Sequence, residues 1–99
     1  MSFSAEIEAD ARLRILQALL KETDHRLSDR LLVRALEPWG HRKSIDFVRT
    51  QLHALKEVGA VTLPLEAATA VIAELTVAGR EHVERRRVIS GVLRPDPGE

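Results

Sequence analysis

The stretch from residue 44 to residue 59 constrains the fold most, because its apolar side chains recur at helical spacing and both of its ends carry capping residues. Ser44 is a favourable N-cap, and Gly59 stands where a left-handed C-cap residue belongs. Spacings of three and four residues place four apolar side chains on one stripe: Val48, Leu52, Leu55 and Val58. The remaining side chains are polar and mostly basic. The sequence therefore predicts an amphipathic helix over residues 44–58.

The segment after this helix changes its apolar period to two, which is typical of β-strands. Apolar residues alternate over residues 60–66 and again over 71–75, so we predict a β-hairpin. Pro64 removes a backbone donor, and the first strand should therefore lie at a sheet edge. The tip at residues 66–69 lacks a tight-turn dipeptide such as Asn-Gly, so a short helical turn is the alternative there.

Two further helices are expected before the central one. Ser4 is the candidate N-cap of a first helix over residues 5–22, which has a wide apolar face. Turn-prone residues over 23–30 should break the chain. Ser28 can then cap a second helix that ends near Pro38. Its side chains predicted to point inward are Leu31, Leu32, Ala35, Leu36 and Trp39.

The last predicted helix follows Thr76, a suitable N-cap, and covers residues 77–88. Three valines could pack it against the rest of the chain: Val77, Val83 and Val88. Residues 89–99 contain two prolines and two glycines, so we expect a flexible tail. The sequence thus predicts one folded domain over residues 1–88 and a tail over residues 89–99.

Composition limits the class of protein. A chain of 99 residues is long enough for one modest hydrophobic core. It contains no cysteine and no apolar run near the roughly 20 residues that a membrane span needs, so we expect a cytoplasmic protein. Fifteen basic residues balance fifteen acidic ones, which argues against avid nucleic-acid binding by the molecule as a whole.

Charge is distributed less evenly than the total indicates. Residues 41–56 contain four basic residues and one acidic residue, so the central helix is locally basic. A second cluster between residues 80 and 94 holds five arginines and two glutamates. Each cluster is equally compatible with an ordinary solvated surface.

The order of these elements resembles the winged helix-turn-helix superfamily that includes the ArsR-type regulators. The resemblance implies a mostly α fold with a small β-hairpin (α+β): three helices, a two-stranded wing, a C-terminal helix and an extended tail. The metal-sensing cysteines of ArsR repressors are missing, so their ligand response does not transfer. The chain more narrowly resembles small uncharacterised winged-helix proteins of Mu-like phages and prophages, for which no activity can be carried over. The residues that carry the resemblance are Trp39 to Arg42, Ser44, Asp46, Val48 to Leu52, Leu55, Gly59, Val61, Leu75, Thr76, Gly79, Arg94 and Pro95.

In a helix-turn-helix, the second helix of the motif enters the major groove and basic residues at its flanks contact phosphates. Arg49 could present its guanidinium to guanine, although a surface ion pair with Asp46 is the alternative. Asp46 itself is unfavourable near phosphates unless it accepts from cytosine or pairs with an arginine. The candidate DNA-binding residues are Arg42, Lys43, Ser44, Asp46, Arg49, Thr50, His53 and Lys56.

Catalytic and metal chemistry have little support in the sequence. The four histidines show no ligand spacing, and His82 is expected at the surface beside the arginines. The five glycines are scattered and no nucleophile-base motif is present, so we expect neither an enzyme nor a cofactor. Trp39, the only tryptophan, is expected in the core between the second and third helices.

Two classes of function therefore remain. The first is a transcriptional regulator that binds duplex DNA as a homodimer. The second is a phage protein-interaction or adaptor module on the same scaffold, without DNA binding, which fits the zero net charge and Asp46. In either class the first helix and residues 77–88 are the candidate dimer seam.

Overall fold

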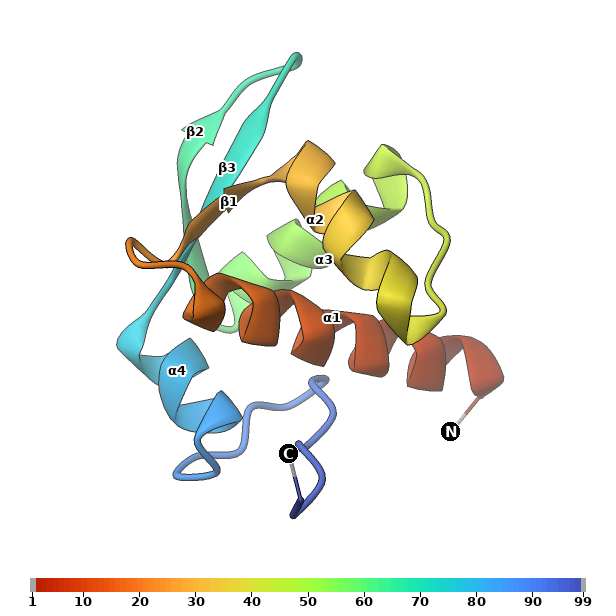
Figure 1. The fold of residues 1–99 in the computed structure, drawn as a ribbon, viewed down its shortest axis with the longest axis vertical. Coiled ribbons are helices and arrows are strands. Elements are labelled where there is room, and N and C mark those ends of the chain that lie inside the picture. Colours follow the sequence, from red (N-terminus) through yellow and green to blue (C-terminus); the bar gives the residue numbers. More distant parts are fainter. Residues whose placement is uncertain (1, 99) are drawn as a thin grey trace.

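The computed structural model describes residues 2–98, which form an α+β fold of four α-helices and a three-stranded antiparallel sheet (Figure 1). Met1 and Glu99, the outermost residues of the two predicted segments, lie outside the described residues. No helix in the described part of the chain is long and apolar enough to cross a membrane. The elements are α1 (Phe3–Lys21), β1 (Arg26–Ser28), α2 (Asp29–Leu36), the 3-10 helix η1 (Glu37–Trp39), α3 (Ile45–Glu57), β2 (Val61–Glu66), β3 (Val71–Leu75) and α4 (Val77–Val83).

Helix α1 forms the centre of the molecule, and the other helices pack around it (Figure 1). Five of its apolar side chains are fully buried: Ala11, Leu13, Ile15, Leu16 and Leu19. The helix begins at Phe3, two residues earlier than predicted, because the Ser2 hydroxyl accepts the Ala5 backbone N–H. Ser4 therefore lies within the first turn and is not the N-cap. Both serines have the side chain that caps a helix, and the structure uses the earlier one.

The other predicted caps are confirmed. The side chains of Ser28, Ser44 and Thr76 each accept a backbone N–H three residues ahead, at the starts of α2, α3 and α4. Gly59 follows α3 with a φ of 78°, which is the left-handed conformation predicted for it.

The predicted apolar faces are correct except at their ends. On α3, Val48, Leu52 and Leu55 are fully buried, whereas Val58 is exposed because the helix ends at Glu57 and Val58 is its C-cap. On α2, Leu32 and Leu36 are buried, but Leu31 is 51% exposed.

Trp39 does not lie in the core as the sequence predicts. It is 46% exposed, because the 3-10 turn of η1 carries the chain away from the axis of α2. The guanidinium of Arg14 stacks on its ring at 3.7 Å from the centroid, a cation–π contact at the surface.

The β2–β3 hairpin is confirmed, and its tip is closed by a hydrogen bond from the Ala67 N–H to the Ala70 carbonyl, not by a helical turn. Strand β2 lies at a sheet edge as predicted, and its register shifts between Thr62 and Leu65, where Pro64 stands. The third strand, β1, was not predicted. It pairs with β3 in the order β1-β3-β2, and three residues are too few to show an alternating pattern.

Helix α4 ends at Val83, not at residue 88, since Arg85 takes a positive φ of 66°. Val88 lies beyond the end of the helix and is exposed, and Val77 at its first position is exposed as well, whereas Val83 packs partly against the core. The prediction that all three valines pack inward was wrong for two of them.

His82 is buried, contrary to the sequence-based expectation, and connects α4 to the C-terminal segment. Its Nδ1 accepts the Ile89 N–H at 3.0 Å, so Nε2 carries the proton and donates to the Leu93 carbonyl at 2.8 Å. The Leu93 N–H donates to the Ala9 carbonyl, and Ile89 and Val92 are buried. The segment predicted as a flexible tail, residues 89–99, thus runs along α1 over its described part (Figure 1).

The start of α4 approaches the end of α3 very closely. A Cβ on Gly79 would lie 2.2 Å from the Ala60 carbonyl oxygen and 2.8 Å from a methyl group of Leu75. The Thr76 N–H donates to that same carbonyl, which fixes the backbone on both sides of the contact. Only glycine fits at this position without moving the backbone.

We expect Gly79→Ala to lower the free energy of unfolding by about 2 kcal/mol, because the added methyl group cannot be accommodated without displacing backbone. Gly98→Ala is the control, since a Cβ there meets no atom within 4 Å. Urea unfolding followed by circular dichroism measures both. Equal stabilities of the two variants would contradict the close approach.

Candidate nucleic-acid interface

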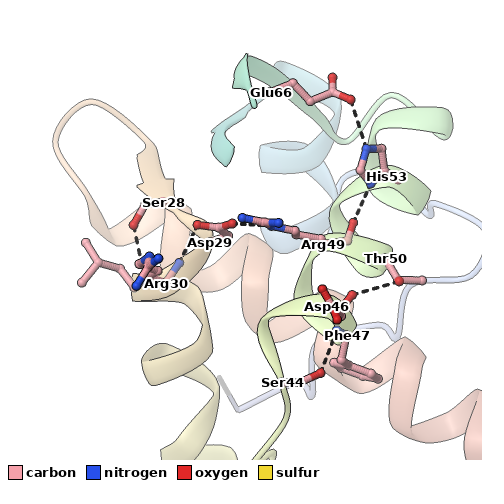
Figure 2. A network of polar contacts seen from close by, with 11 residues as sticks. Ser28, Asp29, Arg30, Ser44, Asp46, Phe47, Arg49, Thr50, His53 and Glu66 are labelled. Carbon is pink, nitrogen blue, oxygen red and sulfur yellow. Dashed lines mark hydrogen bonds and ion pairs between the residues drawn. The ribbon is translucent and has the colours of Figure 1, made fainter. Parts of the chain in front are cut away.

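The eight predicted DNA-binding residues lie on α3 or in the loop before it, on the side away from the buried stripe of the helix. Figure 2 shows part of this polar face, with Ser44, Asp46, Arg49, Thr50 and His53 labelled, between the start of α2 and the end of β2. Six of the eight are exposed, and Lys43 and Arg49 are partly buried. The structure therefore gathers all eight on one side of α3, but it gives their charged groups different partners.

Arg49 binds a buried carboxylate at the start of α2. Its Nε donates to Asp29 Oδ2 at 2.7 Å, and Asp29 is fully buried. The other carboxylate oxygen accepts the Arg30 backbone N–H. Neither predicted role of Arg49, base reading or a surface pair with Asp46, describes this contact. The ion pair instead fixes α3 against α2 (Figure 2).

Two further cationic candidates are held by the last residue of β2. Glu66 accepts from Lys56 Nζ at 3.0 Å and from His53 Nε2 at 3.1 Å. His53 Nδ1 also lies 2.8 Å from the Arg49 carbonyl oxygen (Figure 2). Glu66 therefore joins the hairpin to α3 and neutralises positive charge on the face that would meet phosphates.

The hydrogen bond from Lys56, followed by that from His53, lowers the pKa of Glu66 below its ordinary value of 4.5. A depressed carboxyl pKa means that this contact contributes to stability above the pKa of the unfolded chain. The contribution is lost as the pH falls through the lower value of the folded state. At neutral pH the carboxylate is ionised and the contact is present.

The loop before α3 carries the remaining cations. His41 anchors it, because this buried side chain donates through Nε2 to Asp10 of α1 at 2.6 Å. Lys43 lies over the Phe47 ring with its Nζ 5.3 Å from the centroid. Arg42 is exposed and makes no hydrogen bond or ion pair within residues 2–98.

At the start of α3, the hydroxyl groups of Ser44 and Thr50 already have hydrogen-bond partners within the helix. Ser44 caps the Phe47 N–H, and the Thr50 hydroxyl donates to the Asp46 carbonyl at 2.9 Å. The Asp46 carboxylate is exposed and pairs with no basic side chain of the described chain. Arg42 and Lys43 are therefore the cations of this face that carboxylates do not neutralise.

Sequence reasoning missed the two carboxylates that organise this face. Asp29 directly follows the cap Ser28, and Glu66 ends an otherwise apolar strand, so each had a local signal of being unusual. Their partners lie 20 and 10 or 13 residues away, and only the tertiary fold brings them together. Among the described residues, no group of three or more metal-ligating side chains is close enough to hold an ion.

Comparison with known proteins places the chain among phage proteins. No family model matches the sequence. The uncharacterized protein gp26 of Escherichia phage Mu is 34% identical over 88 residues, which cover 89% of this chain and 90% of that protein. The chain belongs to the gp26 family. This confirms the predicted likeness to proteins of Mu-like phages.

In the present chain, Arg49→Ala should lower the free energy of unfolding by about 3 kcal/mol, because it leaves the buried Asp29 carboxylate without its ion-pair partner. Arg42→Ala removes an exposed arginine from the same face and should change stability by less than about 0.5 kcal/mol. Urea unfolding measures both variants.

A double variant that also removes the charge of Asp29 tests the same ion pair in a second way. Asp29→Asn combined with Arg49→Ala removes the buried charge and should recover part of the loss. If Arg49→Ala is as stable as Arg42→Ala, the ion pair does not fix α3.

Proposed function

We propose that this protein is a winged helix-turn-helix regulator that binds duplex DNA through α3. The observation that carries the proposal is the exposed, capped N-terminal turn of α3 with Arg42 and Lys43 beside it, while the opposite side of the helix is buried. The element order α1-β1-α2-α3-β2-β3, with the hairpin packed beside α3, supports a winged helix.

The contacts of the polar face assign roles to the candidate residues. Arg42 and Lys43 would contact phosphates, and Asp46 and Thr50 in the first turns would meet base edges. Arg49 is a positioning residue, because it binds Asp29 and thereby sets the angle of α3. Lys56 and His53 would reach phosphates only after Glu66 releases them.

The proposal includes a homodimer that acts in the cytoplasm of the bacterial host. In such a dimer the two α3 helices would reach half-sites one helical turn of DNA, about 34–36 Å, apart. Val77 and Val88 are exposed apolar side chains from the predicted dimer seam. The apolar residues of α1 predicted to share that seam are mostly buried inside the chain, so residues 77–88 would have to supply most of it.

The alternative is a phage adaptor module that binds protein and not DNA. The specific observation in its favour is the charge of the hairpin, which contains Glu66 and Glu74 but no lysine or arginine. A wing of this kind would repel phosphates. Neither reading involves catalysis, so we propose a binding protein without enzymatic activity.

We expect the protein to bind a mixed-sequence duplex in fluorescence anisotropy at about 50 mM salt and to lose affinity steeply by about 200 mM, because phosphate contacts release counterions. Arg42→Glu combined with Lys43→Glu should weaken binding more than tenfold at the lower salt concentration and reduce the salt slope by about 2. A stoichiometry of two chains per duplex site is expected from the dimer.

The control for this titration is the pair Arg34→Glu and Arg94→Glu, which makes the same change in net charge at two exposed residues outside α3 and outside the candidate dimer seam. An equal loss in the control would mean that only the total charge matters. No binding at the lower salt concentration would reject the regulator and favour the adaptor.

We further expect Glu66→Gln to bind the duplex several-fold more tightly at neutral pH, since it frees Lys56 and His53 and removes a negative charge facing DNA. Glu22→Gln is the matched control, because it removes one exposed negative charge after the end of α1, away from α3. Unchanged or weaker binding by Glu66→Gln, measured by the same titration, would contradict the role given to Glu66.

A further inference from the structure

A groove of about 780 Å³ runs between α1 and α2, and no residue of α3 lines it. Both walls are helical. The wall of α1 includes Gln17, Ala18 and Lys21, and that of α2 includes Leu31, Arg34 and Ala35, so each wall presents side chains spaced three and four residues apart. Such a pair of parallel stripes is the shape into which a third helix packs.

The groove contains apolar side chains that nothing in the described chain covers. Leu31 and Trp39, predicted to be core residues, both line it and are about half exposed. Arg14 stacks on the Trp39 ring and so holds it at the groove edge. A second hollow of about 340 Å³ is also lined by Trp39 and Lys21, together with Leu20 and Val83. Tryptophan and arginine are typical of the residues that dominate protein–protein binding, and an exposed apolar patch such as that of Leu31 and Trp39 marks an interaction site.

The rim of the groove is positively charged. Lys21 and Arg34 are exposed and form no ion pair with any residue from 2 to 98. Glu22 is the one acidic side chain among the groove-lining residues. Charge complementarity therefore selects an acidic occupant.

We propose that this groove docks an acidic amphipathic helix of a partner protein. Its apolar residues at positions i, i+3 or i+4, and i+7 would contact Leu31 and Trp39, and its acidic flanks would pair with Lys21 and Arg34. A second copy of this chain is a poor donor of such a helix. The acidic end of α1 already uses Glu8 to bind Arg12, and Asp10 to bind Arg14 and His41.

The docked helix leaves α3 accessible, because the groove and the polar face of α3 share no residue. The proposal therefore does not depend on DNA binding. A regulator could hold DNA and partner together, and an adaptor could use the groove alone.

The test is a selection of peptides of about 16 residues from a random library on the immobilised full chain, a length that gives a helix of about 24 Å. Enriched sequences should be acidic and carry apolar residues at the stated spacing. Trp39 is the only tryptophan, so its emission should change when a synthetic copy of an enriched peptide binds. Leu31→Ser and Arg34→Glu should each weaken that peptide about tenfold.

Matched controls use exposed residues outside the groove: Leu93→Ser and Arg86→Glu should bind as the unmodified chain does. Circular dichroism verifies that all four variants are folded. The proposal is overturned if no peptide is enriched, if the enriched peptides are basic, or if the two groove variants bind them unchanged. It is equally overturned if duplex DNA displaces the peptide, or if sedimentation shows a dimer that excludes it and is lost in Leu31→Ser.

Discussion

The burial of α1 is the constraint on which the rest of the structure depends. Leu13, Ile15, Leu16 and Leu19 are inaccessible to solvent, and α2, α3, α4 and β3 all contact the helix. Each of these four elements gains its place from the part of α1 that it covers. The C-terminal segment follows the same rule, since Ile89 and Val92 become buried where it passes along α1. Removing apolar surface from water is the main favourable term for a chain of this size.

Polar contacts then set the orientation of α3 within that apolar framework. Hydrophobic packing alone permits a helix to rotate or slide, whereas an ion pair to the buried Asp29 has one satisfactory geometry. His41 does the same for the loop before α3 by binding Asp10. These two contacts hold the polar face in a fixed position relative to α1 and α2, which is the property that a binding surface needs.

The polar face shows how a chain of zero net charge can carry a locally basic surface, most of whose basic side chains are bound by carboxylates. Asp29 and Glu66 neutralise three of the five cationic candidates, while Arg42 and Lys43 remain without a carboxylate. The proposed DNA contact therefore depends on the loop before α3 and on the release of Glu66. The groove between α1 and α2 is a separate surface, with its own exposed apolar residues and its own unpaired cations.

The sequence by itself determined where the helices and the hairpin lie and three of the four helix N-caps, because these features depend on residues three or four apart or on strict alternation. Ser28, Ser44, Thr76 and Gly59 all act as their local sequence predicts. Only the tertiary structure decided what Arg49, His82, Trp39 and the strand β1 do, since each depends on a partner distant in sequence. Arg49 finds Asp29, Trp39 finds Arg14, and β1 pairs with β3 across more than forty residues. Periodicity encodes which side of an element is apolar, but the identity of a polar partner across the fold has no local signature.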